Sequence, residues 1–340
     1  MTANQLHGFI SPRRTLLTMK EATIGTTPML SRFMIAATVF LFVVSSAVHG
    51  CYAQQVMSDV AISGAGLNDG YLNGGQCDSQ GNLYRERNHS RRTSVMRVAW
   101  NGSTVVFATP DNEELSAVAP DRLGVTLLSS SFSDRQGVSR YIYRFDLQGR
   151  LISQNQVFLD FSPSKIAITS SGKIVAVGYR PQDEAKKPMG AVLEADGQVA
   201  HLFEFPPTNV EWAWGLIRES NGLTYFIPNS QTEAIYSISE SGRINIIPVA
   251  PTSGTRVHKW LFGEGVAVKE YDFPSEKGSH ATWFDIYDLG TGKRIGKKSL
   301  PKGMGFTTAC YLGDAVSWLA LGGQGSQELR LVTVKLKNDN

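Results

Sequence analysis

The sequence has no excess of charge of one sign over most of its length. Its 340 residues carry a formal charge of +3, and residues 1–53 account for all of it. The charged side chains in that segment are Arg13, Arg14, Lys20, Arg32 and the single acid Glu21. The remainder contains equal numbers of basic and acidic side chains. A neutral body without a basic stripe argues against nucleic acid as a partner.

The N-terminal region also lacks a hydrophobic run long enough to span a membrane. Its apolar run, residues 33–44, falls short of the roughly 20 residues that a transmembrane helix needs. Arg32 precedes this run and Cys51-Tyr52-Ala53 follows it, which is the pattern of a secretory signal peptide. We therefore expect cleavage after Ala53, export to the periplasm or the extracellular space, and no transmembrane anchor in the mature protein.

Two alternatives remain open in this region. Met29 would open a conventional signal peptide, so it is an alternative start of translation. The segment Val48-His49-Gly50-Cys51 resembles a bacterial lipobox with Cys51 lipidated, although His49 departs from that motif. The predicted division of the chain is an N-terminal extension and signal over residues 1–53 and one domain over residues 54–340.

Short catalytic motifs are absent as well. The sequence contains no Gly-x-Ser-x-Gly elbow, no His-Glu-x-x-His, no Walker loop and no Cys-x-x-Cys pair. These absences argue against the enzymes that such local motifs identify. They do not argue against an active site assembled from single residues on separate parts of the chain.

What the sequence does have is a pair of glycine-marked turns that recurs six times. The first series contains Gly81, Gly124, Gly172, Gly222, Gly265 and Gly313. The second contains Gly102, Gly149, Gly197, Gly242 and Gly290, whose successive members are 45 to 48 residues apart. Each turn lies between short β-rich runs, so each repeat has four strands. This period predicts an all-β, six-bladed β-propeller of four-stranded antiparallel blades.

The repeats also predict how the ring closes. In the third repeat the expected strands are residues 165–169, 174–178, 190–194 and 199–203, and polar connections are expected at residues 87–92, 180–188 and 272–278. The sixth repeat has a third strand over residues 329–336, but the chain stops at Asn340 before a fourth. Because an unpaired edge invites aggregation, we expect residues 56–63 to pair beside residues 329–336 and complete the last blade.

Only three cysteines occur, and Cys51 leaves with the predicted signal. Cys77 and Cys310 fall on the innermost strands of the first and sixth repeats, which are neighbours in a closed ring. In an oxidising compartment they can form a disulfide beside the channel. The alternative is two buried free thiols, since a bridge needs Cα atoms within about 7 Å.

One turn carries a family resemblance. The run Cys77-Asp78-Ser79-Gln80-Gly81-Asn82-Leu83-Tyr84 resembles the D-x-x-G-N-[IVL]-Y core of NHL repeats and of the related six-bladed propellers of the senescence-marker and gluconolactonase group. The motif is complete in the first repeat only, so the resemblance concerns the fold. A lactonase of that group would hold a divalent cation such as calcium at the channel mouth. The candidate ligands are Asp78, Asp160, Asn209 and Glu211, each with a turn or capping role as the alternative.

Residues at the start of the innermost strands are expected to line one mouth of the channel. The ligand-binding candidates among them are Lys165, Trp212, Trp214, His258 and Lys259. Indole planes beside cations would suit a sugar, a carboxylate-bearing metabolite or a peptide terminus. The alternative packs both indoles between blades and leaves the lysines extending to solvent.

Two functions are therefore open. The first is an exported, non-enzymatic ligand-binding or protein-interaction module that needs no cofactor. The second is a metal-dependent hydrolase or lactonase of the gluconolactonase type. Three or four oxygen ligands within about 2.6 Å of one point would favour the second.

Overall fold

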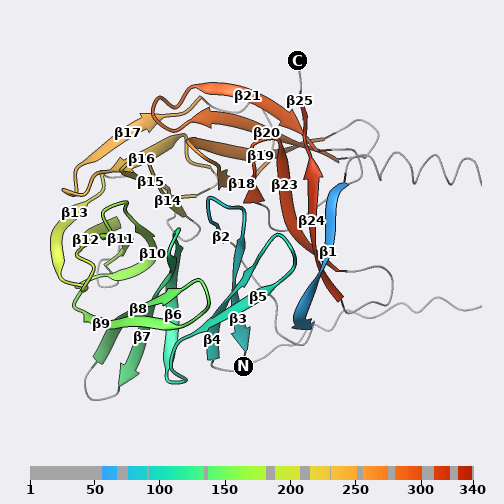
Figure 1. Ribbon diagram of the computed structural model, residues 1–340. Coiled ribbons are helices and arrows are strands. Elements are labelled where there is room, and N and C mark those ends of the chain that lie inside the picture. The colour runs from blue at the N-terminus through green and yellow to red at the C-terminus, as the bar shows by residue number, and fades with distance from the viewer. Residues whose placement is uncertain are drawn as a thin grey trace, which may run out of the picture. The chain divides into compact units, whose positions relative to one another are not determined.

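Six antiparallel sheets form the blades of a β-propeller, as the turn repeat predicts (Figure 1). The computed structural model describes residues 56–66, 76–89, 92–133, 137–180, 188–206, 215–229, 231–250, 256–274, 280–300, 310–321 and 328–338. The chain divides into two units, Met1–Tyr52 and Ala53–Asn340. The first unit, with the predicted signal, Met29 and Cys51, lies outside the described residues. Within the described ranges, no helix is long and apolar enough to cross a membrane.

Each blade is an antiparallel meander whose first strand, strand A, is innermost. The strands of blades 1 to 3 are β2 (Gln76–Cys77), β3 (Leu83–His89), β4 (Arg92–Val98) and β5 (Thr104–Ala108); β6 (Glu113–Pro120), β7 (Gly124–Ser133), β8 (Gly137–Asp146) and β9 (Leu151–Val157); and β10 (Ser162–Ile168), β11 (Ile174–Tyr179), β12 (Pro188–Leu193) and β13 (Val199–Glu204). The four strands of blade 3 agree with the prediction to within a few residues at each end.

Blades 4 to 6 repeat this order. Their strands are β14 (Leu216–Ser220), β15 (Leu223–Ile227), β16 (Ala234–Ile238) and β17 (Ile244–Pro248); β18 (Arg256–Phe262), β19 (Val266–Pro274), β20 (His280–Asp288) and β21 (Arg294–Ser299); and β22 (Cys310–Tyr311), β23 (Ala315–Leu321), β24 (Glu328–Lys335) and β1 (Val56–Gly66). Two hairpins are longer than predicted, because strand pairing continues to His89↔Arg92 and to Pro274↔His280 through residues expected in polar connections.

Most of the predicted turn glycines adopt the left-handed backbone conformation that tight turns require. Gly102, for example, has a φ of 79°. A side chain there would also meet the carbonyl oxygen of Ala61 in β1, because this turn of blade 1 approaches the last strand of blade 6. Glycine is therefore needed at this turn for two separate reasons.

Two predicted turn positions differ. Gly124 is the first residue of β7, without a positive φ, because Asp121 closes that turn. The Oδ1 atom of Asp121 accepts hydrogen bonds from the N–H groups of Leu123 (2.6 Å) and Gly124 (2.8 Å). In the second turn of blade 5 the left-handed residue is Gly292, with a φ of 68°, rather than Gly290.

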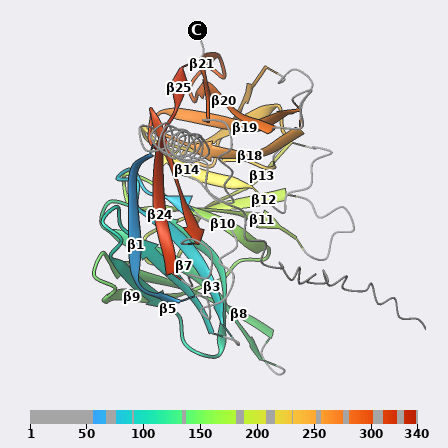
Figure 2. The same cartoon turned by 90° about the vertical axis from the view of Figure 1, so that its right-hand side faces the viewer.

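The predicted closure of the ring is confirmed. Strand β1 pairs antiparallel with β24, from Val56↔Val334 to Gly66↔Glu328, and takes the fourth position of blade 6. Figures 1 and 2 show the blue β1 beside the red β24. An ion pair between Asp59 Oδ1 and Arg330 Nε, 2.6 Å apart, links the two strands.

The C-terminal residues take a place that the sequence did not predict. Strand β1 fills the outer position of blade 6. Strand β25 (Lys337–Asn338) instead pairs with β21, through Lys298↔Asn338 and Ser299↔Lys337, and adds a fifth strand to blade 5.

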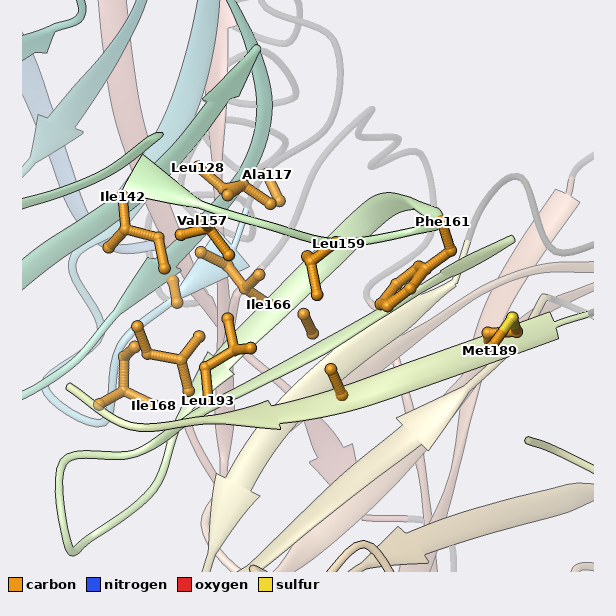
Figure 3. Close-up of a cluster of buried hydrophobic side chains, with 14 residues drawn as sticks. Ala117, Leu128, Ile142, Val157, Leu159, Phe161, Ile166, Ile168, Met189 and Leu193 are labelled. Carbon is orange, nitrogen blue, oxygen red and sulfur yellow. The ribbon is translucent and has the colours of Figure 1, made fainter. Parts of the chain in front are cut away.

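Six clusters of buried side chains lie between successive blades, one for each interface among the described residues. Figure 3 shows the cluster between blades 2 and 3, where Leu128 and Ile142 meet Ile166, Ile168 and Leu193. Burial of one such side chain contributes roughly 1.5–3 kcal/mol. Successive side chains of a strand point to opposite faces of the blade. Each blade therefore contributes side chains to the cluster on either side of it.

A disulfide joins Cys77 of β2 to Cys310 of β22, with their Cα atoms 5.7 Å apart. Of the two states that the sequence left open, the structure therefore has the bridge. It connects the first and last blades at the inner edge of the ring, so β1 and the disulfide close the propeller at two separate places.

Candidate functional site

The innermost strands enclose a cavity of about 1030 Å³ at the centre of the ring. Strand A of every blade contributes to its wall, and both disulfide cysteines line it. Pockets for small ligands commonly measure about 300–1,000 Å³. The cavity is therefore large enough to take a small molecule.

Five basic side chains line this cavity: Arg122 and Arg144 of blade 2, and one from the innermost strand of each of blades 3, 4 and 5. Lys165 comes from β10, Arg218 from β14 and Lys259 from β18. Lys165 and Lys259 were predicted ligand-binding residues, and the structure places both in the same cavity. Arg218 was not predicted.

β-Bulges set the positions of the two lysines. The register of β10 with β11 shifts at Ser164, directly before Lys165. The register of β18 with β19 shifts at His258, directly before Lys259. Such bulges re-aim side chains and are frequent beside functional sites. The two lysines therefore occupy equivalent positions in blades 3 and 5.

Lys165 shares the cavity with a carboxyl group, Glu86 of β3. Burial lowers the pKa of the Lys165 ammonium, and the charge of Glu86 opposes that shift. Burial raises the pKa of Glu86, and Lys165 opposes this second shift. Glu86 is exposed to the cavity, but the surrounding blades limit its contact with bulk water, which favours the neutral form of the carboxyl group.

Lys259 has a closer partner. Its Nζ atom lies 3.5 Å from Oε2 of the buried Glu270. Burial lowers the pKa of Lys259, Glu270 raises it, and the neighbouring Arg85 lowers it further. Burial also lowers the pKa of Arg85, to about 10. Positive charge is thus concentrated around Lys259 even with its acidic partner in place.

Arg218 lies between the two lysine-bearing strands. Its Nη1 atom donates a hydrogen bond to the carbonyl oxygen of Phe262 in β18, at 3.1 Å. Burial lowers the pKa of the guanidinium, and Asp78, Glu219 and Glu264 oppose the shift. A guanidinium has five N–H donors, so this single bond leaves others to face the cavity.

Asp78, a candidate metal ligand, has its oxygen atoms engaged in the first turn of blade 1. Oδ1 accepts hydrogen bonds from the N–H groups of Gln80 (2.9 Å) and Asn82 (3.0 Å). Oδ2 accepts from Asn82 Nδ2 (2.7 Å) and from the Tyr84 hydroxyl (2.9 Å). Burial, followed by the charge of Asp78, raises the pKa of Tyr84. This is the turn role that the sequence left as the alternative.

Of the other metal candidates, the structure describes only Asp160, which is not brought to Asp78. Asp160 precedes β10, at the opposite end of the innermost strands, where its Oδ2 lies 2.6 Å from Arg180 Nη2. Asn209 and Glu211 lie outside the described residues. In the part of the chain that the structure describes, no three His, Cys, Asp or Glu side chains gather closely enough to hold a metal ion.

Trp212 and Trp214 also lie outside the described residues, and for His258 the description covers the backbone in β18 only. The predicted convergence of these side chains with Lys165 therefore stays a prediction. Arg218 and Glu86 were not predicted, because only residues at the starts of the innermost strands were expected to line the channel. A charged residue inside a run predicted as a strand is the signal that would have found both.

The fold and the cavity together define a six-bladed β-propeller whose central channel presents basic side chains from four blades. No protein-family model matches the sequence, and no curated protein is similar to it. Virginiamycin B lyase from Staphylococcus aureus, in selenomethionine form, is 13% identical, with a TM-score of 0.42 over 81% of this chain and 98% of that one.

Two other solved structures are similarly distant. A streptogramin B lyase is 12% identical, with a TM-score of 0.41 over 83% of this chain and 99% of that one. A protein of unknown function from Bacteroides caccae is 13% identical, with a TM-score of 0.42 over 67% of this chain and 81% of that one. At this identity the likeness concerns the fold alone.

Proposed function

We propose that the protein is an exported, non-enzymatic binding module that holds a small carboxylate-bearing ligand in its central channel. The observation that carries the proposal is the presence of Lys165, Arg218 and Lys259 in the wall of one cavity. Burial lowers the pKa of all three groups. A bound anion would favour their charged forms and gain charge-assisted hydrogen bonds.

The walls support a ligand with an apolar part as well as an anionic group. Ile166, Ile217 and Leu261 line the cavity beside the three cations. Pockets that combine an apolar lining with a few polar groups are typical of small-molecule sites. Trp212 and Trp214, in the segment that leads into β14, would extend this surface toward a sugar or an aromatic ligand.

Export is supported by the N-terminal signal pattern and by the disulfide. Disulfides persist mainly in oxidising compartments outside the cytosol, and the Cys77–Cys310 bridge closes the ring. A ligand site in this protein would then bind solutes of the periplasm or the extracellular medium.

The test is a thermal-shift screen of the exported, processed protein against acetate, gluconate, glutamate and citrate. A ligand that binds only the folded state raises the Tm in proportion to the logarithm of its concentration. We expect such a rise in the wild type, a loss of it in Lys165→Met, and no loss in Lys293→Met, which changes an exposed lysine outside the channel lining. No response to any of the four anions, or an equal response in Lys165→Met, would refute the proposal.

The same preparation tests the enzymatic alternative. A stoichiometric divalent cation found by metal analysis, together with lactone hydrolysis that depends on it, would replace the binding proposal with the hydrolase.

A further inference from the structure

Lys165 differs in its surroundings from Lys259 and Lys173. Lys259 pairs with Glu270 at 3.5 Å, and outside the channel Lys173 pairs with Glu194 at 2.8 Å. The Nζ atom of Lys165 makes no hydrogen bond or ion pair with any residue that the structure describes, and interacts with Glu86 only electrostatically. Its amine is thus available to a ligand in the cavity.

The environment of this amine favours its neutral form. Burial lowers the pKa of Lys165, and each unit by which an ammonium pKa falls gives about tenfold more free amine at neutral pH. Apolar neighbours such as Ile166 and Ile217 reinforce the effect by limiting hydration. Desolvated lysines in such pockets are nucleophiles toward carbonyl groups.

We infer that Lys165 captures a small carbonyl compound that also carries a carboxylate, as a reversible imine inside the channel. The inference rests on the proposed function, because Arg218 and Lys259 would hold the carboxylate of the same ligand. Those two side chains come from the next two innermost strands around the ring. An aldehyde or ketone acid would therefore meet an amine and two cations in one cavity.

Glu86 supplies the proton that the step needs. The free amine of Lys165 adds to the carbonyl carbon, and one of its N–H protons moves to the oxygen, which becomes the hydroxyl of a carbinolamine. The neutral carboxyl group of Glu86, whose raised pKa favours that form, protonates this hydroxyl. Water leaves, the nitrogen lone pair forms the C=N bond of a protonated imine, and Glu86 becomes a carboxylate. No oxidation or reduction occurs, and added water reverses the step.

The probe is glyoxylate, which carries one aldehyde and one carboxylate. The exported protein is incubated with glyoxylate and cyanoborohydride at neutral pH, which reduces any imine to a stable secondary amine, and the modified lysines are mapped by mass spectrometry. We expect Lys165 to be modified faster than the exposed Lys293, because burial lowers the pKa of the Lys165 ammonium. Excess acetate, an anion without a carbonyl group, should slow modification of Lys165 and leave Lys293 unaffected.

Lys165→Arg is the control for trapping at this position. Its guanidinium is always protonated and forms no imine under these conditions, so residue 165 of this variant should stay unmodified. The inference would be overturned if Lys165 were modified no faster than Lys293, or if Lys259 were modified in preference to Lys165. If carboxylates bind the wild type while no lysine of the channel is trapped, the imine fails and the binding function stands. If no carboxylate binds the wild type, both fail.

Discussion

Lys165 of blade 3 and Lys259 of blade 5 occupy equivalent positions in β10 and β18, each directly after a β-bulge. Arg218 lies on the strand between them, and all three side chains line one cavity. The same structural repeat that builds the ring therefore places basic groups from distant parts of the sequence at one site. This relationship is the basis of the functional account.

Replacement of Ile62 tests the closing strand. This side chain of β1 is 5% exposed and packs with Leu83 and Leu331 between blades 6 and 1. Ile62→Ala should lower the free energy of unfolding by about 2–5 kcal/mol. Met57→Ala on the same strand is the control, because Met57 is 59% exposed and such a change costs at most about 0.5 kcal/mol. Equal losses in urea unfolding would contradict the closure by β1.

Removal of the disulfide should destabilise the ring without changing its fold. The bridge joins residues separated by 233 positions, and a cross-link over a long loop restricts the unfolded chain strongly. We expect Cys77→Ala/Cys310→Ala to lose roughly 2–5 kcal/mol of unfolding free energy. Reduction of the wild type should give a similar unfolding midpoint. An unchanged midpoint in both experiments would show that the bridge contributes nothing to stability.

Two turn glycines should respond differently to alanine. Gly172 and Gly102 have φ values of 87° and 79°, so alanine at either position is strained by about 1–2 kcal/mol. Only at Gly102 would the added Cβ also meet the backbone of Ala61, whereas nothing lies within 4 Å at Gly172. Gly102→Ala should therefore have the lower melting temperature of the two. The reverse order would contradict the contact between this turn and β1.

The pH dependence of stability should report on Lys165. Burial lowers its pKa below the unfolded value of about 10.4, so the unfolded state binds more protons between the folded and the unfolded pKa. Below the folded-state pKa, burial of the charged amine lowers the unfolding free energy by its full amount. This loss disappears as the pH rises to the unfolded-state pKa. Lys165→Met should therefore flatten the rise of unfolding free energy on the alkaline side of neutrality, while Lys293→Met should leave that rise as it is.

The fold could be predicted from the sequence because each blade repeats the same local signals. Turn glycines, β-rich runs and a missing last strand led to six blades and to the pairing of β1 with β24. Two local features were not part of the prediction. Asp121 closes the turn before Gly124 with its side chain, and β25 adds a fifth strand to blade 5.

The site could be predicted only in part, because it depends on contacts between blades. The positions of Lys165 and Lys259 followed from the repeat, since both lie near the start of an innermost strand. Glu86 lies on β3, the second strand of its blade, and lines the cavity beside the two-residue strand β2. Neither the shortness of that strand nor the hydrogen bond of Arg218 to β18 can be seen in a local pattern.

The most direct test of the account is the Kd of the tightest carboxylate from the screen, measured by calorimetry at fixed ionic strength. One charge-assisted hydrogen bond contributes about 1.5–3 kcal/mol, so Lys165→Met should weaken binding by about tenfold or more. The control Lys293→Met should remain close to the wild type. A wild-type Kd that Lys165→Met leaves unchanged would contradict the claim that the channel cations form the ligand site.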